Sequence, residues 1–426
     1  MGIDVCSWLL FLAVLVNQMG RVMIPAVKTS VIADKDYAPQ FEESVGAMLS
    51  GVSLVCLAGK LLAAAVTDKL GGWLVLISVF VMWIVATIAA SVVYSVDVFG
   101  AAWLLNSFAY TITWGAALQV IGATYEGEER SANLAFCSSA SRFGATFGNI
   151  LFGQLLSYGL HWRQSLLPML PLQALLLLMC GYYWATSRKP KEEAKPAAKK
   201  AAGKKEEAAA EGPSVLQAML SLDFWLMLLP KAVIFTYTQF FMNYIPQLLH
   251  VDYGFDHGPA ATYGGIAQGG SVVGLLYVGN VLYKSSNAAG KVNLVLIELV
   301  VCTLVPALLA NGPLVKSTTG LDLAPLVVPL LVLWGLAYAL PFYIPPGEFA
   351  MQVGGKSATA LYTNLFDAAG FTVSAIWNPW ASAAAKRGDF STVLYSQALF
   401  GFISLVCMPL CMSRVNAKAQ AQKKKD

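Results

Sequence analysis

RKPKEEAKPAAKKAAGKKEEAAAEGP, residues 188–213, is the stretch that decides how this chain folds. It consists of lysine, arginine, glutamate, alanine, proline and glycine, and it holds no large apolar residue. Such a segment has no apolar surface to bury, so it stays in water. Residues 1–187 and 214–426, on either side of it, are by contrast nearly unbroken apolar sequence. We therefore predict a charged linker between two membrane-embedded halves.

The composition excludes a soluble protein. Of the 426 residues, 57% are hydrophobic and 12% are charged, whereas charged residues make up roughly 25% of a soluble domain. Apolar segments of about 20 residues recur on both sides of the linker, and no segments alternate in the way of a β-barrel. We predict an all-α integral membrane protein with twelve transmembrane helices in two pseudo-symmetric six-helix bundles. The expected spans are 5–32, 44–67, 73–94, 100–124, 131–158, 165–187, 222–249, 259–283, 292–310, 324–352, 357–384 and 391–412.

These spans divide the chain into four parts. We expect an N-terminal bundle at 1–187, the linker at 188–213, a C-terminal bundle at 214–413 and a basic tail at 414–426. Lysine and arginine accumulate on the cytosolic side of membrane proteins, so the N-terminus, the linker and the tail are expected to be cytosolic. The basic loop residues Lys69, Arg130, Lys284 and Lys291 are expected on the same side. The membrane in which the protein resides is not indicated.

The sequence does not contain the residue clusters of an enzyme, a metal site or a cofactor site. The three histidines fall in predicted outer loops, and the seven cysteines fall within apolar spans without metal-ligand spacing. No glycine-rich phosphate loop follows a predicted strand. The basic residues gather in the linker and tail, which is ordinary in membrane proteins and does not indicate a nucleic-acid partner. We expect no enzyme activity, no cofactor and a monomer in the bilayer.

The most specific short motif is GKLLAAAVTDKLGG, residues 59–72, at the end of the second span. It is similar to the loop signature of the major facilitator superfamily between the second and third helices. Gly59 would allow close helix contact, Gly71 a tight turn, and Asp68 beside Lys69 a charge pair with the opposite half. We interpret these residues, with Arg130 in a later loop, as a gate. The alternative is a tight cytosolic turn with a solvated charge pair.

A weaker copy of this spacing follows the linker. Gly274 stands nine residues before Tyr283 and Lys284, just as Gly59 stands nine residues before Asp68 and Lys69. Parallel halves of this kind form alternating-access carriers, in which the substrate site lies near mid-membrane between the halves. The repeat therefore favours a carrier.

Charged residues deep inside spans indicate the substrate. The first half holds Arg21 and Arg142 with no buried acid, and the second holds Lys231 with Asp367, Glu298 and Glu348. A cation inside a membrane needs a partner or water, so we predict an anionic substrate, with Arg21 as a bidentate clamp and Lys231 as a point charge. The alternative is internal pairing of Asp367 with Lys231, with Arg142 reaching toward the cytosol. The other candidate substrate-binding residues are Asn17, Gln18, Tyr237, Gln239, Asn243, Tyr343 and Asn364.

Two coupling modes remain open. Proton symport commonly uses a buried carboxylate or histidine, and the first half offers neither. Exchange of one anion for another needs no such group, so exchange is the simpler mechanism. Asp367 is the residue through which proton coupling could act.

Several stretches resemble the sugar-phosphate exchangers among the organophosphate:phosphate antiporters. They are KSATALYTNLFDAAGFTVSAIWNPWAS from Lys356, GLAYALPFYIPPGEF upstream of it, the loop YEGEER at 125–130, Asn106 with Trp114, and YTQFFMNYIPQLL before HVDYGFD. The resemblance implies rocking bundles and a phosphate site made by basic residues on the first and seventh helices. Those positions fall near Asn17 and Thr238 here, and Ser141 and Arg142 replace the histidine common on the fifth helix.

The resemblance implies exchange of a sugar phosphate or glycerol phosphate for inorganic phosphate. The segment RVMIPAV, which contains Arg21, also resembles the related anion:cation symporters. A proton-coupled symporter or exporter of another organic anion or a neutral solute is the alternative. A protein of transporter fold that serves as a sensor or assembly partner without flux is the third.

Overall fold

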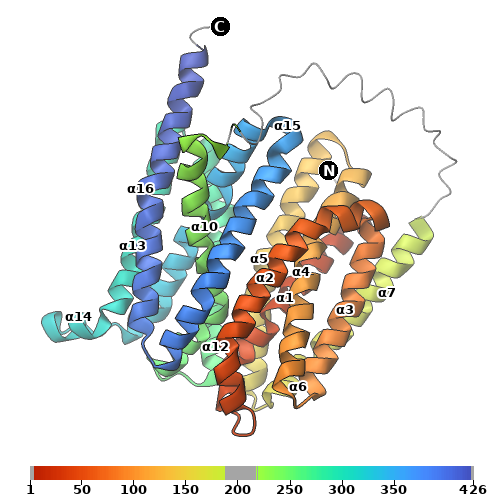
Figure 1. Ribbon diagram of the computed structural model, residues 1–426, viewed down its shortest axis with the longest axis vertical. Coiled ribbons are helices and arrows are strands. Elements are labelled where there is room, and N and C mark those ends of the chain that lie inside the picture. The colour runs from red at the N-terminus through yellow and green to blue at the C-terminus, as the bar shows by residue number, and fades with distance from the viewer. Residues whose placement is uncertain (1–3, 188–216, 218, 424–426) are drawn as a thin grey trace.

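A computed structural model describes residues 4–187, 217 and 219–423, so the predicted linker at 188–213 lies outside the described residues. We refer to residues 4–187 as the first half and to residues 219–423 as the second half. The described residues of the first half form helices joined by short turns (Figure 1). Its helices are α1 (Val5–Ala33), α2 (Ala38–Leu70), α3 (Gly72–Val92), α4 (Val96–Thr124), α5 (Gly127–Ser157), α6 (Trp162–Leu166) and α7 (Met169–Ser187).

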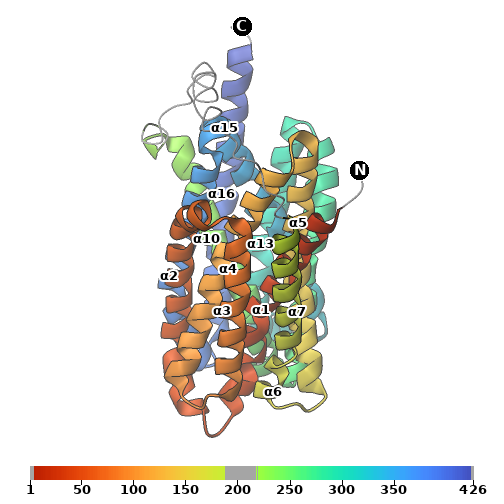
Figure 2. The same ribbon diagram turned by 90° about the vertical axis from the view of Figure 1, so that its right-hand side faces the viewer.

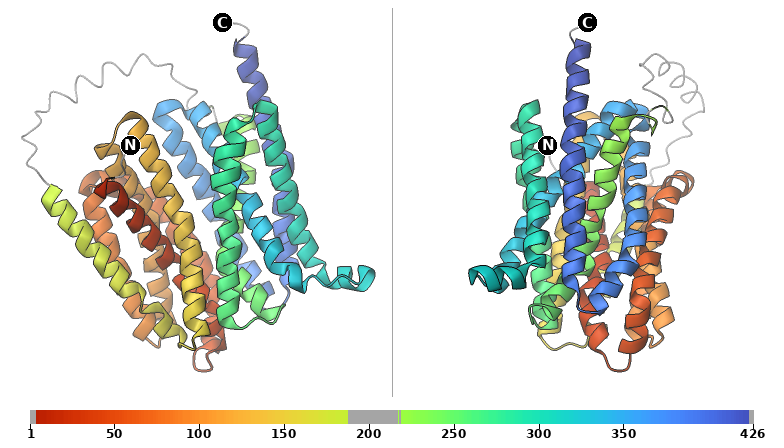
Figure 3. Two further views of the ribbon diagram at one scale, coloured as in Figure 1. Left: turned by 180° about the vertical axis from the view of Figure 1, so that it is seen from behind. Right: turned by 60° about the vertical axis from the view of Figure 1, so that its left-hand side comes forward.

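The second half contains six further crossings. Its elements are α10 (Leu222–Asn243), α11 (Ile245–Val251), α12 (His257–Val273), the π-helix η1 (Gly274–Tyr283), α13 (Ala288–Ala310), α14 (Gly312–Thr319), the short 3₁₀ helix η2 (Ala324–Leu326), α15 (Val327–Lys386) and α16 (Phe390–Lys423). Two features were not predicted: η1 continues α12 as a π-helix, and α14 extends sideways from the second half (Figures 1 and 3). The helix α16 also runs on through most of the expected basic tail.

The element α15 is one continuous run of helical residues, yet it crosses the molecule twice. The rings of Phe349 and Phe366 lie 6.1 Å apart between centroids, whereas 17 residues of straight helix would separate them by about 25 Å. Figure 1 accordingly shows two blue limbs at α15 rather than one rod. The tenth and eleventh predicted spans are these two limbs.

Twelve crossings are consistent with the hydropathy of the described segments. Nine of these segments are long and apolar enough to span a membrane; α4, α5 and the second limb of α15 are not among them. The helix α5 falls short because it carries many small and polar residues, among them Ser138, Ser141 and Arg142. Such residues are tolerated in a membrane helix that faces other helices or a cavity. The protein is thus an all-α membrane protein, as predicted.

Both chain ends lie at one end of the helix bundle. In Figures 1 and 2 the N-terminus, the C-terminus and the two edges of the grey segment all lie toward the top of the molecule. We call this the linker end, and we call the opposite end, which holds His161, Asp252 and Arg387, the far end.

The two halves contact each other mainly through two helix pairs. Yellow α5 lies against green α12 in Figure 3, and α2 lies against the second limb of α15. A Cβ atom on Gly258 would lie 2.2 Å from Ser157 Oγ, and one on Gly265 would lie 2.8 Å from Asn149 Cβ, so only glycine fits. In the second pair, the Ser50 hydroxyl donates to the carbonyl of Ala375 (2.8 Å). Small residues and interhelical hydrogen bonds are what holds helices together in lipid.

Among the described residues, these contacts lie in the middle and far parts of the helices. In α5 the polar and glycine contacts across the halves run from residue 142 to residue 157, and in α2 they run from residue 46 to residue 60. Since α2 runs toward the linker end and α5 runs away from it, the α5 range covers the far half of its helix, and the α2 range covers the middle of its helix and reaches toward the far end. The halves are therefore packed together at the far end.

Enlarging one interface glycine should weaken this packing. A Cβ atom on Gly153 would lie 2.4 Å from Thr262 Oγ1 and 2.5 Å from the Thr262 backbone nitrogen, and overpacking of this kind costs about 1–3 kcal/mol. We expect Gly153→Val to lower the midpoint of thermal unfolding of the purified protein by several degrees. Gly181→Val is the matched control, because no atom lies within 4 Å of a Cβ atom there. Equal midpoints for the two variants would contradict the close contact.

Candidate substrate site

A central cavity of about 290 Å³ lies between the halves. Its walls come from α1, α2, α4 and α5 of the first half and from α10, α12, η1 and both limbs of α15 in the second. Every charged side chain in its lining is listed here: Arg21, Lys60, Arg142, Lys231 and Asp367. A cavity shared by both halves is where an alternating-access carrier holds its substrate.

The single carboxylate in this lining joins the two halves. Asp367 Oδ2 lies 3.4 Å from Lys60 Nζ of α2, and Asp367 Oδ1 lies 3.5 Å from Lys231 Nζ of α10. About a fifth of the Asp367 side chain is exposed, so the cluster is partly wet. The predicted alternative of an Asp367–Lys231 pair is therefore present, but with a second lysine that was not among the predicted site residues.

Lys231 has a further partner that follows from the prolines of α15. Its ammonium donates to the carbonyl of Phe342 at 3.1 Å and lies 3.3 Å from the centroid of the Phe342 ring. Pro346, four residues later, has no backbone N–H with which to bond that carbonyl. The helix therefore leaves one carbonyl free, and Lys231 is placed to use it.

The two arginines are held by aromatic rings rather than by acids. The guanidinium carbon of Arg21 lies 4.1 Å from the centroid of the Tyr110 ring, and that of Arg142 lies 4.4 Å from the Tyr343 ring. Neither arginine forms an ion pair with a carboxylate of the described residues. A guanidinium stacked on a ring keeps its N–H edges available for a planar oxyanion.

The charge of the cavity is therefore unbalanced. Four cations face one carboxylate, which leaves a formal excess of three positive charges among the described lining residues. The predicted alternative in which Arg142 reaches toward the cytosol is not what the structure shows, because Arg142 points to Tyr343 inside the cavity. Buried cations without counter-ions are costly, so this excess of positive charge is the main chemical feature of the cavity.

The other predicted substrate-binding residues are divided between the cavity and the core. Asn17, Gln18 and Tyr343 line the cavity, and Gln18 accepts a hydrogen bond from the Ser141 hydroxyl (3.3 Å). Tyr237 instead donates to the carbonyl of Gln397 (2.9 Å) inside the second half. Three further predicted residues lie outside the cavity lining. The Asn243 amide donates a hydrogen bond to Gln239 Oε1 (3.1 Å), and half-buried Asn364 lies beside the lining residues Thr363 and Phe366.

Helical periodicity explains the placement in α10. The cavity-facing residues of α10 are Lys231, Phe235, Thr238 and Met242, which are spaced by three or four positions. Tyr237, Gln239 and Asn243 lie off that stripe. A polar side chain in α10 is therefore not by itself a sign of the cavity wall.

The predicted gate residues lie at the linker end of the first half, except for Gly59, which lies deeper in α2. A Cβ atom on Gly59 would lie 2.0 Å from Thr111 Oγ1, so Gly59 lets α2 approach α4. Gly71 has φ +82° between α2 and α3, a conformation that favours glycine. Asp68, Lys69 and Arg130 are exposed, and all the side-chain contacts that we describe between the halves lie nearer the far end.

Lys60 lies inside the predicted span 44–67, but it was not counted among the buried charges because the motif that contains it was interpreted as a gate. The helix α2 continues to Leu70, so Lys60 lies ten residues, or about 15 Å, inside it. The same count of depth that singled out Arg142 identifies Lys60 as a buried cation. The first half thus holds one more cavity cation than the sequence analysis assigned to it.

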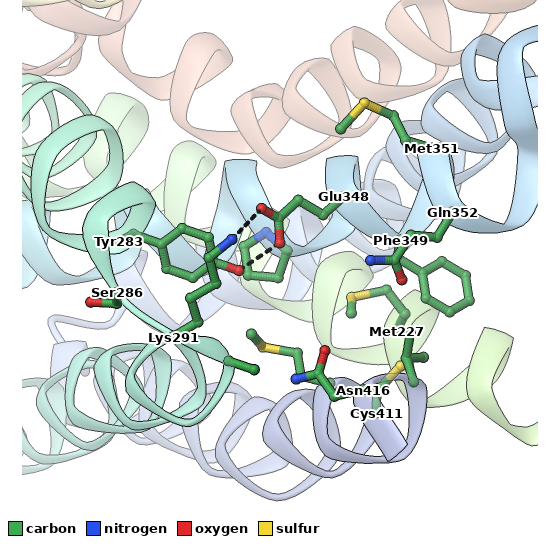
Figure 4. Close-up of a pocket in the computed structure, with 14 residues that line it drawn as sticks. Met227, Tyr283, Ser286, Lys291, Glu348, Phe349, Met351, Gln352, Cys411 and Asn416 are labelled. Atoms are coloured by element: carbon green, nitrogen blue, oxygen red, sulfur yellow. Dashed lines mark hydrogen bonds and ion pairs between the residues drawn. The ribbon is translucent and has the colours of Figure 1, made fainter. Parts of the chain in front are cut away.

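The acids Glu298 and Glu348, proposed as possible partners of Lys231, lie elsewhere. Glu298 is buried in α13, outside the cavity lining. Glu348 lines a separate cavity of about 490 Å³ at the linker end of the second half (Figure 4). There its carboxylate accepts a hydrogen bond from the Tyr283 hydroxyl (2.7 Å) and pairs with Lys291 (3.2 Å).

This second cavity is larger than the central one but does not suit a carrier's substrate. All its lining residues belong to the second half, so rocking of the halves would not switch its exposure. Its two charges, Lys291 and Glu348, also balance each other. The central cavity is therefore the candidate substrate site.

Comparison with known proteins identifies the family. Residues 10–378 match the sequence model of the Major Facilitator Superfamily. The chain belongs to this superfamily. It is therefore a secondary transporter and not an enzyme. The comparisons do not support the narrower assignment to the organophosphate:phosphate antiporters.

Solved structures show the same fold at low sequence identity. The nucleoside transporter NupG is 17% identical, with a TM-score of 0.65 over 96% of this chain and 99% of that one. A NupG mutant is 16% identical, with a TM-score of 0.67 over 95% and 99%. The D-xylose–proton symporter is 13% identical, with a TM-score of 0.68 over 94% and 96%. No curated protein sequence matches the chain. At these identities the structures establish the fold alone.

Removing the central carboxylate should destabilise the protein more than removing it together with a lysine. Asp367→Asn leaves Lys60 and Lys231 without their counter-ion, and breaking a buried pair costs more than deleting both partners. We expect the midpoint of thermal unfolding to fall in Asp367→Asn and to recover in part when Lys60→Met is added. If the double variant were less stable than Asp367→Asn, the ion pair would not be the source of the loss.

Proposed function

We propose that this transporter carries a small anionic metabolite by alternating access through the central cavity. The observation that supports the proposal is the charge of the lining, in which Arg21, Lys60, Arg142 and Lys231 face Asp367 alone. Two of these cations lack a carboxylate partner in the described part of the chain and present guanidinium groups beside tyrosine rings. A substrate with two negative charges would bring the charge of the site close to balance.

The form that we propose to test first is exchange of an organophosphate, a sugar phosphate or glycerol phosphate, for inorganic phosphate. A phosphate group offers several acceptor oxygens in the geometry that an arginine fork can bind. Its mostly dianionic state at neutral pH suits an excess of three positive charges. A cavity of about 290 Å³ also suits a small metabolite.

Exchange also agrees with the position of Asp367. A proton carrier must give up and take back its proton, whereas Asp367 lies between two lysines that stabilise its charged form. An anion that enters the cavity can instead compete with Asp367 for the lysines. This competition couples binding to the contact between α2 and the second half.

We further propose that the linker end faces the cytosol. In the sequence the lysine-rich linker follows α7 and precedes α10, and Lys424 and Lys425 follow the end of α16 at Lys423. These helix ends lie at the linker end, and positive charge is retained on the cytosolic side. The structure, packed at the far end, then corresponds to a carrier closed toward the outside.

Neutralising Arg21 should abolish anion transport. Arg21→Ala removes the guanidinium edge that we assign to the substrate oxyanion, and we expect anion uptake to fall to the background of empty vesicles. Arg21→Lys keeps the charge without the fork, and we expect an intermediate loss. The matched control is Arg387→Ala, which removes an exposed cation at the far end. Uptake near the wild-type rate in Arg21→Ala would overturn the assignment of Arg21 as the clamp.

The transport mode is tested with the unmodified protein in proteoliposomes preloaded with phosphate. We expect uptake of radiolabelled phosphate that needs internal phosphate, is inhibited by sugar phosphates and is unaffected by a proton ionophore. Loss of uptake with the ionophore would instead support a proton-coupled symporter acting through Asp367. Inhibition by dicarboxylates alone would point to another organic anion, and no flux of any anion would favour a sensor or assembly protein.

A further inference from the structure

Lys28 is a buried cation that the central cavity does not use. It lies in α1, and its side chain is only 2% exposed. Its ammonium lies 4.6 Å from the centroid of the Tyr244 ring, at the junction of α10 and α11 in the second half. None of the ion pairs among the described residues includes Lys28. An ammonium without a counter-ion is costly to bury, so its position calls for a reason beyond packing.

Lys28 continues the line of the cavity toward the far end. It follows Arg21 by seven residues, which is two helical turns or about 10 Å along the same face of α1. The cavity-lining residues of α1, among them Val14, Asn17 and Arg21, belong to this stripe. Lys28 is therefore the next cation that an anion would meet between the central cavity and the far end.

The Tyr244 ring covers Lys28 on the side of the second half. Tyr244 donates its hydroxyl to the carbonyl of Asn378 (3.1 Å), and the Asn378 amide donates to Ser53 Oγ of α2 (3.1 Å). The chain of contacts thus leads from the first half to the second and back again. It lies in the far part of α1 and α2, where the halves are packed together.

Backbone hydrogen bonding is interrupted close to this contact in both halves. Pro25 lies three residues before Lys28, inside α1, and removes the backbone bond to the carbonyl of Arg21. On the other side α10 ends at Asn243, and α11 begins with Ile245 and Pro246. Pro25 therefore marks a position where α1 can bend, and Tyr244 is a break between α10 and α11, so the ends of α1 and α10 can move apart there.

We propose that Lys28 is an outer anion-binding residue, covered by Tyr244 when the far end is closed and exposed to the anion when it opens. This inference rests on the proposed function, because the ligand is the same small oxyanion. Opening would exchange the ring of Tyr244 for water and the anion. Lys28 would then pass the anion to Arg21, one step deeper along α1.

The test compares the two faces of the membrane. Phosphate exchange is measured in right-side-out and inside-out vesicles with the unmodified protein, Lys28→Met and Lys28→Arg. We expect Lys28→Met to raise the KM for phosphate at the far face about tenfold, as loss of one charge-assisted hydrogen bond would, and to leave the KM at the linker face unchanged. Lys28→Arg keeps the charge and should resemble the unmodified protein at both faces.

Stability gives a second readout. Lys28→Met removes an unpaired buried charge, so we expect it to raise the midpoint of thermal unfolding; Lys28→Gln is the neutral substitute if the methionine variant does not fold. An unchanged KM at the far face, or an equal rise at both faces, would overturn the inference while leaving the proposed function intact. If the unmodified protein exchanges neither phosphate, sulfate nor a dicarboxylate at either face, the proposed function fails and this inference fails with it.

Discussion

One constraint shapes this structure: a single carboxylate, Asp367, forms ion pairs with two lysines inside the membrane. Asp367 lies between Lys60 of the first half and Lys231 of the second, and its charge is what makes both lysines tolerable at mid-membrane. Because the pair with Lys60 crosses between the halves, it also sets how closely α2 approaches the second limb of α15. Any ligand that changes the charge near Asp367 changes that approach, which is how binding can alter the conformation.

The packing around this cluster is arranged so that the halves can move. Glycines at the α5–α12 interface bring backbones into contact without interlocking side chains. The hydrogen bonds between α2 and the second limb of α15 use serine hydroxyls, an asparagine amide and backbone carbonyls. Such hydrogen bonds have defined partners, so they make the packing of the two halves specific.

Much of this architecture could be predicted from the sequence. Hydropathy placed the crossings, because a helix in lipid needs about 20 apolar residues wherever it lies. Hydropathy could not show that the residues between the tenth and eleventh spans are also helical, because they are not an apolar span. It also could not show which residues of the two limbs meet, such as Phe349 and Phe366. The depth of Arg21, Arg142 and Lys231 could be counted along each span, and all three line the cavity. The depth of Lys60 could have been counted in the same way, because Lys60 lies inside the predicted span 44–67. The stacking of Arg142 on Tyr343 could not, because it joins residues from different halves.

The carbonyl of Phe342 that Pro346 leaves free has one more consequence. It gives Lys231 a neutral acceptor that neither a proton nor a substrate can remove. Lys60 has no second acceptor of this kind among its described contacts, so the two lysines that pair with Asp367 are not equivalent. If Asp367 moves away, Lys231 keeps its hydrogen bond to the carbonyl of Phe342 in its own half. Lys60 then loses the one ion pair described for it. The asymmetry begins with Pro346, a residue of the second half, and it leaves the lysine of the first half as the one whose contacts depend on Asp367.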